Sequence, residues 1–449
     1  MINYELLLKD FGKIETCKNL DSEELKTLDY DFYKGNVVWE IQTEITFNNK
    51  NIDVIFYLSF PNDFPFVTPK VFISKESYND LKYIPHINED LSICIFDEGL
   101  NLILPKNDYV SLIELMISKA KKIIRDAENI EYRKREFKRE FKAYWELNYS
   151  KNDRIQNLGF QSIDDDSTAE VKGIKFINKY LSNYEYFISN NDTDLKKIKE
   201  YAKDCNCIFK EVGILFIENE FIEPPFELTF TDTLAILKKD NNNYIKFKEL
   251  CRNNDFDSVL VVFINNNNSS KEYYGWTYHN AEIVPRKKGG DRNVSSKVDH
   301  LSNKINEKKY ATRLTFDSIS LNRLELRTTG YTETQKSVSI SGLGSVGSNL
   351  IFFLKNLPIN KFNLIDKEVL SSENIKRHLS GFSLLKINKA DALKIELKNA
   401  NPLIEVGTRT QSVTTIIETE ADFINDCDFH IVAIGKTMIE EFILNVSSI

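Results

Sequence analysis

The chain is poor in cysteine and contains no long apolar run. Its 449 residues include 6 cysteines at irregular intervals: Cys17, Cys94, Cys205, Cys207, Cys251 and Cys427. That spacing argues against a secreted disulfide framework and against a four-cysteine zinc site. No apolar run reaches the roughly 18 residues that a membrane span needs, and the first residues lack the basic start and apolar core of a signal peptide. We therefore predict a cytoplasmic chain with reduced thiols, and we assign no metal ligands.

The charge balance argues against two classes of partner. The formal net charge is −8, which gives no global attraction for nucleic acid or for an anionic membrane. An apolar content of 42% and a charged content of 28% are ordinary for a globular protein. The length predicts roughly two to four domains. Composition and periodicity divide the chain into three segments, which are 1–150, 151–330 and 331–449.

The middle segment, 151–330, alternates helical and strand-like runs, and we predict an α/β linker domain there. "DTDLKKIKEYAKD" has helical periodicity behind an Asp cap. "VGILFIE" and "SVLVVFI" are short apolar runs bounded by polar residues, as buried strands are. This segment holds no catalytic pattern.

A strand, a glycine turn, a helix and a second strand follow one another in 336–366. The glycines Gly342, Gly344 and Gly347 form "GLGSVG", and Asp366 ends the second strand. In a nucleotide-binding βαβ unit the first glycine makes the turn, the second lets a phosphate approach, and the third packs helix on strand. The terminal acid binds ribose hydroxyls. We predict a nucleotide site, and the alternative is a glycine turn without a ligand.

The residues after Asp366 bear on which nucleotide binds. Asn374, Arg377 and Lys389 follow in order before "ANP". Arg377 and Lys389 suit a triphosphate, because cations neutralise the charge that develops on leaving pyrophosphate. A nicotinamide-dependent dehydrogenase needs only the glycine loop and the acid, and it remains the weaker alternative.

These residues resemble the adenylation domain of ubiquitin-activating and ThiF/MoeB-like enzymes. "SENIKRH" is similar to the family's "SNLxRQ" segment, and "NKADALKIELKNANP" matches the lysine-led helix that runs to "NP". The resemblance implies a Rossmann-like fold in which Asp366 binds the ribose and Asn374, Arg377 and Lys389 handle the phosphates of Mg-ATP. It also implies that a protein's C-terminal carboxylate attacks the α-phosphate, which gives an acyl-adenylate and pyrophosphate.

The chain departs from that family at its C-terminal end. The strand "DFHIVAIG" is followed by Lys436 and Thr437, where the family carries a magnesium-binding acid, while Glu440 and Glu441 come later. We expect Mg²⁺ to be bound mainly through ATP. The remaining strands and the region of the family's acceptor cysteine are not found before Ile449. The adenylation domain is therefore expected to be truncated, either as a fragment or as a shortened domain.

The first segment, 1–150, combines strands, a proline-rich strand exit and two helices. Helical spacing begins after Asn107 or Asp108, and a second helix is expected to carry Phe137, Phe141, Tyr144 and Trp145 on one face. "FPNDFPFVTPKVFI" resembles the "FPxxYPxxPPxVxF" segment of the ubiquitin-conjugating fold, an α+β fold, in its divergent bacterial members. "HIN" at 86–88 stands for the family's His-Pro-Asn.

The resemblance places Cys94 at the acyl-acceptor position. A thiolate is the nucleophile for thioester exchange, and Asn88 is a candidate donor to the oxyanion. For His86 we favour a hydrogen-bonding role in the loop over that of a general base. The competing interpretation of Cys94 is a buried structural cysteine, which is the usual fate of a cysteine outside a disulfide.

The order of the segments resembles the fused activating and conjugating proteins of bacterial antiphage operons, best known from CBASS. That resemblance implies that the activated tail belongs to a cGAS-like nucleotidyltransferase or a ubiquitin-like protein and is joined to a target amine. It also implies a homodimer through the adenylation domain. Arg323, in the segment before the glycine loop, is a further candidate phosphate contact. The alternative function is a non-catalytic scaffold that binds such a tail.

Overall fold

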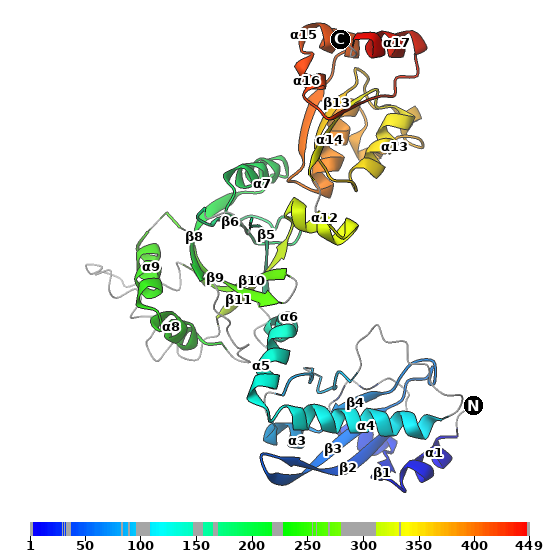
Figure 1. Ribbon diagram of the computed structural model, residues 1–449, viewed down its shortest axis with the longest axis vertical. Helices are drawn as coiled ribbons and strands as arrows, with labels where there is room; N and C mark the ends of the chain where they lie inside the picture. Colours follow the sequence, from blue (N-terminus) through cyan, green and yellow to red (C-terminus); the bar gives the residue numbers. More distant parts are fainter. Residues whose placement is uncertain are drawn as a thin grey trace. The chain divides into compact units, whose positions relative to one another are not determined.

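The computed structural model describes most of the chain, and the helices and strands are labelled in Figure 1. The described residues are 3–28, 30, 32, 37–81, 84–88, 90–95, 108–146, 156–164, 169–217, 228–253, 255–256, 258–267, 270–279, 311–331 and 334–446. They form two compact units. The first comprises Met1–Arg154, Asn219–Leu228 and Asn265–Lys271, and the second comprises Ile155–Glu218, Thr229–Ile264 and Glu272–Ile449.

The first unit is built on a four-stranded antiparallel sheet in the order β1-β2-β3-β4. Its strands are β1 (Thr16–Asn19), β2 (Val38–Phe47), β3 (Lys50–Ser59) and β4 (Lys70–Ile73). The β2–β3 hairpin turns at Asn48 and Asn49, both with positive φ, a conformation that asparagine tolerates better than most residues. Between β3 and β4 the chain leaves the sheet at Pro61, as the proline spacing predicts.

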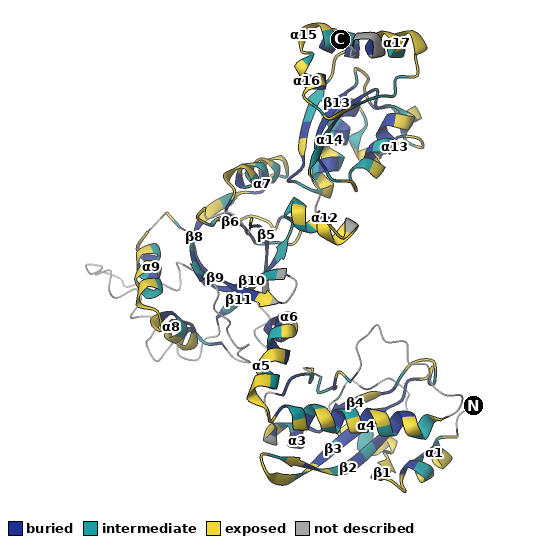
Figure 2. Cartoon of the chain, in the orientation of Figure 1, coloured by how far each residue is buried: buried dark blue, intermediate teal, exposed yellow. Residues whose placement is uncertain are grey.

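The helices described in this unit are α1 (Tyr4–Phe11), α2 (Ser22–Thr27), α3 (Lys75–Asp80), α4 (Tyr109–Asp126), α5 (Ile130–Arg139) and α6 (Phe141–Glu146). Apolar residues of α1 and α4 pack in the same core as the sheet. The side chain of Asp108 accepts from the Ser111 N–H and caps α4, which confirms the predicted start of this helix; Asn107 lies outside the described residues. One face of α4 is buried and the opposite face is exposed (Figure 2).

The predicted second helix is in fact two helices. α5 ends at Arg139 and α6 begins at Phe141, with Glu140 between them. The four aromatic residues predicted to share a face are all buried: Phe137, Phe141, Tyr144 and Trp145. The break matters for the site, because the side chain of Glu140 contacts the cysteine hairpin described below.

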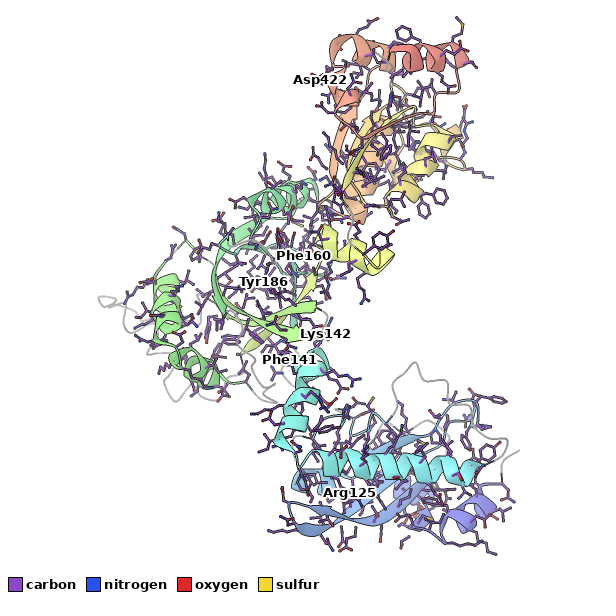
Figure 3. All side chains as sticks on the ribbon, in the orientation of Figure 1. Arg125, Phe141, Lys142, Phe160, Tyr186 and Asp422 are labelled. Atoms are coloured by element: carbon purple, nitrogen blue, oxygen red, sulfur yellow. The ribbon has the colours of Figure 1, made fainter. Side chains whose placement is uncertain are left out.

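The middle of the chain forms a closed barrel, ordered β10-β11-β5-β7-β6-β8-β9. Its strands are β5 (Gln156–Ser162), β6 (Lys172–Phe176), β7 (Tyr186–Ser189), β8 (Phe209–Ile217), β9 (Ser258–Asn267), β10 (Ser270–His279) and β11 (Thr312–Ser318). Phe160 and Tyr186 lie on its paired strands β5 and β7 (Figure 3). The two predicted buried strands are β8 and β9, which pair in parallel. Barrel closure is not predicted by the sequence patterns.

Among the described residues, the helices between the barrel strands are α7 (Asp192–Asp204), α8 (Phe230–Lys238) and α9 (Asn241–Arg252). The predicted helix "DTDLKKIKEYAKD" is α7, but Asn191 caps it in place of the expected aspartate. The Asn191 side chain accepts from the N–H groups of Thr193 and Asp194, which leaves Asp192 and Asp194 in the first turn near the positive end of the helix dipole.

The C-terminal part of the second unit is a parallel sheet in the order β14-β13-β12-β15. Its elements are α12 (Leu321–Thr329), β12 (Lys336–Ser341), α13 (Ser345–Leu354), β13 (Ile359–Ile365), α14 (Lys389–Ala400), β14 (Glu405–Arg409), α15 (Val413–Thr419), α16 (Asp422–Asn425), β15 (Phe429–Val432) and α17 (Thr437–Val446). Apolar residues of α13 and α14 pack on one face of the sheet, and those of α15, α16 and α17 pack on the other. This confirms the predicted βαβ unit and Rossmann-like architecture.

Candidate functional site

Cys94 lies in a short hairpin that extends the sheet of the first unit beyond β4. The Cys94 N–H donates to the His86 carbonyl at 2.8 Å, and the Asn88 N–H donates to the Ser92 carbonyl at 2.8 Å. The Ile93 N–H in turn donates to the Val71 carbonyl of β4 at 2.7 Å. The hairpin, 86–94, is therefore held on the sheet by main-chain hydrogen bonds.

Side chains along this hairpin alternate between the core and the solvent, and this alternation exposes Cys94. Ile87 and Ile93 pair across it and are only 3% and 6% exposed, because both enter the core beneath α4. Neighbouring side chains in an extended strand point to opposite faces, so Cys94 points away from that core. All six cysteines lie in the described residues, and Cys94 alone is exposed. Exposure makes its thiol accessible to a carbonyl electrophile, in contrast to the buried Cys207 and Cys251.

His86 faces the helices α5 and α6. Its Nδ1 lies 3.0 Å from Glu140 Oε1, and its Nε2 lies 3.6 Å from Glu136 Oε2. Burial lowers the pKa of His86, but the hydrogen bond to Glu140 and the charges of both carboxylates outweigh it, so the net shift is upward. Both ring nitrogens thus face carboxylates. This arrangement suits an imidazolium that is anchored through its two N–H groups, and an imidazolium does not accept a proton from Cys94.

Asn88 lies on the outer side of the same hairpin and is exposed. Its side-chain Nδ2 donates to Ser92 Oγ at 2.9 Å, and Ser92 Oγ donates to Asp90 Oδ1 at 2.6 Å. Ser92 and Asp90 of the turn therefore fix the orientation of the Asn88 side-chain amide. An amide has two N–H donors, so Asn88 retains a second donor for an oxyanion.

The glycine loop connects β12 to α13. Gly342 has φ +90°, and a Cβ there would lie 2.6 Å from the Ala433 carbonyl oxygen. Gly344 is the N-cap of α13 and has no atom within 4 Å of a Cβ placed on it. A Cβ on Gly347 would collide with the Gly342 carbonyl oxygen. The first and third glycines are thus required by packing, and the second borders open space at a helix N-terminus, where an anion is favoured.

Two side chains hold the central residue of this loop. Asp366 Oδ2 accepts from the Leu343 N–H at 2.7 Å, and its Oδ1 accepts from the Glu368 N–H at 2.7 Å. His378 Nε2 donates to the Leu343 carbonyl at 2.9 Å, since its Nδ1 accepts from the Ser380 N–H at 3.0 Å. Asp366 and His378 thereby bring the end of β13 and the segment after it against the glycine loop.

The sequence patterns did not single out His378, although it ends the quoted "SENIKRH" segment. Burial, aided by the positive charge of Lys389, lowers the pKa of His378 and favours the neutral ring. A buried histidine that hydrogen-bonds to a glycine loop has no short sequence signature, because its partner is a main-chain carbonyl 35 residues earlier.

The remaining predicted phosphate ligands differ in their surroundings. The Nζ of Lys389, at the start of α14, lies 2.5 Å from Glu368 Oε2, and this hydrogen bond lowers the pKa of Glu368. Asn374 is buried, and its Oδ1 accepts from both the N–H and the hydroxyl of Ser371. Arg377 is exposed, and its carbonyl accepts from Asn349 Nδ2 of α13 at 3.1 Å, which ties its backbone to the helix that follows the glycine loop.

Arg323 lies in the first turn of α12 and is half-buried. Leu321, two residues before it, packs against the core of the parallel sheet. Within the described part of the chain, no hydrogen bond or ion pair joins Arg323 to the glycine loop, so its role as a phosphate contact stays a prediction.

A carboxylate lies at the turn after β15, although in the sequence it comes a few residues after the position where the family carries its magnesium-binding acid. Glu440 lies in the first turn of α17, and its Oε1 accepts from the Gly435 N–H at 2.8 Å. The side chain therefore returns to the turn where the sequence itself offers Lys436 and Thr437. Within the described residues, no group of three or more His, Cys, Asp or Glu side chains is arranged to hold a metal ion.

Two family models match separate parts of the chain. Residues 18–153 match prokaryotic E2 family B, and residues 324–447 match the ThiF family. The chain thus carries an N-terminal E2-like domain and a C-terminal ThiF domain, and in the sequence the barrel strands lie between the two matched regions. None of the described helices is long and apolar enough to cross a membrane.

Several solved structures are similar to part of the chain. One is the E. coli tRNA N6-threonylcarbamoyladenosine dehydratase TcdA in complex with ATP, at 20% identity over 25% of this chain and 44% of that chain, with a TM-score of 0.21. Others are PaaA (23% identity, 28% and 37% coverage, TM-score 0.23) and E. coli MccB with MccA (20%, 27% and 34%, TM-score 0.23). The chain spans less than half the length of each. No curated protein matches it.

Proposed function

We propose that this chain activates the C-terminal carboxylate of a protein with ATP and passes the acyl group, as a thioester on Cys94, to a target amine. The observation that carries the proposal is the pairing, in one chain, of an exposed cysteine in an E2-like hairpin with a ThiF glycine loop open at Gly344. Either site alone has other uses. Together they supply the two halves of a carboxylate-to-amide reaction.

In the activation step, the carboxylate oxygen bonds to the α-phosphorus of ATP and pyrophosphate leaves. Asp366 retains acceptor capacity for ribose hydroxyls beside its bonds to the loop, since each carboxylate oxygen has two lone pairs. Lys389 and Arg377 neutralise phosphate charge, and Asn374 supports the same segment. Mg²⁺ bound with ATP would further neutralise the phosphates. Glu440 is the chain's carboxylate at the turn after β15 and would help to hold that ion.

In the transfer step, the Cys94 thiolate bonds to the carbonyl carbon of the acyl-adenylate, the bond from that carbon to the phosphate oxygen breaks, and AMP leaves the thioester. An amine then attacks the thioester carbonyl, the Cys94 sulfur leaves as thiolate, and the amine loses a proton. Asn88 donates its second N–H to the oxyanion of these steps, and His86 fixes the loop. The exposure of Cys94 supports this assignment, because both the acyl donor and the amine must reach it.

The partner and the context are inferred from the order of the segments in the sequence. We infer that the activated protein is a cGAS-like nucleotidyltransferase or a ubiquitin-like protein, that the chain forms a homodimer through its adenylation domain, and that the pathway serves antiphage defence of the CBASS type. Sequence resemblance alone supports these inferences, and a test with purified candidate tails decides among them.

The test is to incubate the protein with ATP and each candidate tail protein, and to measure both pyrophosphate release and a thiol-sensitive adduct on Cys94. We expect the adduct with the true partner, and we expect Cys94→Ala to remove it while pyrophosphate release remains. Cys17→Ala is the matched control and leaves the adduct in place. A conjugate formed as fast by Cys94→Ala would contradict the assigned nucleophile.

A non-catalytic scaffold is the second candidate, and one observation favours it. Lys389 is already neutralised by Glu368, so nucleotide binding must displace that carboxylate. A scaffold binds the tail protein without releasing pyrophosphate. Binding of a candidate tail, with neither pyrophosphate nor a Cys94 adduct in the presence of ATP, would favour the scaffold over the enzyme.

A further inference from the structure

A closed ring of hydrogen bonds joins the cysteine hairpin to the end of α5 and to α6. The His86 N–H donates to the Tyr144 hydroxyl at 2.5 Å, and that hydroxyl donates to Glu140 Oε2 at 3.0 Å. The other carboxylate oxygen of Glu140, Oε1, lies 3.0 Å from His86 Nδ1. One residue of the hairpin is therefore bound twice, through its backbone and through its ring, by Tyr144 and Glu140.

Each residue in this ring contacts both of the others. A tyrosine hydroxyl has one donor and can accept, and Tyr144 does both here. Glu140 divides its two oxygens between Tyr144 and His86. The side chain of His86 is 14% exposed, so water competes weakly for these bonds. The ring is thus a rigid connection rather than a surface contact.

The ring restrains the backbone next to Cys94. His86 has φ +67°, a left-handed conformation that is strained for a residue with a Cβ. Its N–H is held by Tyr144, and its carbonyl accepts the Cys94 N–H at 2.8 Å. Fixing the two ends of one strained residue fixes the position of the cysteine that pairs with it.

We propose that Glu140 and Tyr144 are positioning residues for the thioester chemistry of Cys94 and act through His86. The inference rests on the proposed function of Cys94, and it extends that function to two residues outside the hairpin. The helices α5 and α6 then do more than complete the E2-like domain. They hold the acceptor cysteine at the distance and angle from which its sulfur reaches an acyl carbon.

The charges around His86 make the ring sensitive to pH. The imidazole of His86 feels the charges of Glu140, Glu136 and Arg139. Glu136 in turn pairs with Arg135 and Arg139. The net effect raises the pKa of His86. The imidazolium form of His86, which donates from both nitrogens, therefore persists above the ordinary histidine pKa. The ring of hydrogen bonds weakens as pH rises through the raised pKa of His86.

The experiment compares Tyr144→Phe and Glu140→Gln with wild type. Both variants keep the shape of the side chain and remove a hydrogen bond or a charge. The matched controls are Tyr132→Phe and Glu131→Gln, which make the same chemical changes on α5, outside the ring of hydrogen bonds. Melting temperature and far-ultraviolet circular dichroism establish that each protein is folded, and the tyrosine variant decides the question if the glutamate variant does not fold.

Acylation of Cys94 is measured without ATP, with a short peptide whose C-terminus is a mercaptoethanesulfonate thioester. The Cys94 thiolate bonds to the peptide carbonyl, and mercaptoethanesulfonate leaves as thiolate. We expect Tyr144→Phe and Glu140→Gln to slow this exchange about tenfold, the loss of one hydrogen bond to a charged group. The pH profile is the second readout. The inflection assigned to His86 is expected to move to lower pH in Glu140→Gln and to stay in place in both controls.

The outcomes separate the two proposals. Wild-type acylation at Cys94, with unchanged rates and an unchanged pH profile in both variants, would overturn the positioning role and leave the proposed function standing. Absence of acylation at Cys94 in the wild type would count against the proposed function itself. A fall in melting temperature with no change in rate or profile would assign the ring to stability alone and also overturn the inference.

Discussion

Lys389 and Glu368 form an ion pair whose partners differ in exposure. The Nζ–Oε2 distance is 2.5 Å, and the lysine side chain is 6% exposed whereas the glutamate side chain is 63% exposed. A nearly buried cation costs free energy unless an anion faces it. Glu368 supplies that anion from the solvent side, so an arriving phosphate can replace it without leaving the ammonium uncompensated.

Lys389→Ala is expected to weaken ATP binding by about tenfold or more, because it removes a charge-assisted hydrogen bond to phosphate. Glu368→Gln is expected to strengthen ATP binding, since the phosphate no longer competes with a carboxylate, and to lower the melting temperature in the absence of nucleotide. Isothermal titration calorimetry and thermal unfolding measure the two effects. Lys394→Ala, on the same helix, is the matched control. Equal ATP affinity in all four proteins would contradict a phosphate-binding role for Lys389.

The glycines Gly344 and Gly347 are expected to respond differently to alanine. Gly344→Ala meets no atom within 4 Å, so its cost in stability should be smaller than that of Gly347→Ala. The added methyl group occupies the space at the N-terminus of α13 where a phosphate would bind, so ATP affinity should fall. Gly347→Ala would collide with a backbone carbonyl and should destabilise the unit by roughly 1–3 kcal/mol. Differential scanning calorimetry with and without ATP separates the effects, and a stable Gly344→Ala protein with full ATP affinity would place the nucleotide elsewhere.

Cys94 is expected to react with iodoacetamide before the other cysteines. It is the exposed cysteine, whereas burial raises the pKa of the Cys17, Cys207 and Cys427 thiols and keeps them protonated. Peptide mapping by mass spectrometry after brief labelling gives the order of reaction. Labelling in denaturant is the control, because all six thiols then become accessible. Preferential labelling of Cys207 or Cys251 in the folded protein would refute the exposure on which the proposed function depends.

The sequence predicts the parts of this protein that have local signatures. The glycine spacing predicts the βαβ unit, and the polar residue at position 108 predicts the start of α4. The barrel has no such signature, because β6 and β7 are only five and four residues long and each also pairs with a strand that is not its neighbour in sequence. The role of His378 and the contact of Glu440 with the turn after β15 also lack a local sequence signature. Both contacts join side chains to main-chain groups, and any residue at the partner position would serve.

The two units should respond to pH in opposite directions because their histidines are shifted in opposite directions. The raised pKa of His86 gives a stabilisation that is complete below the ordinary value of about 6.5 and is lost as pH rises through the raised value. Burial lowers the pKa of His378 and of His430, so their stabilisation is complete above about 6.5 and is lost as pH falls through the lowered values. Hydrogen-exchange mass spectrometry, corrected for the intrinsic pH dependence of exchange, resolves the two regions in the full chain. From about pH 6 to about pH 8 the hairpin 86–94 should lose protection, and from about pH 7 to about pH 5 the glycine loop should lose it. Glu140→Gln should abolish the first response and spare the second. A loss of protection in both regions on acidification would show that the carboxylates around His86 do not control its charge.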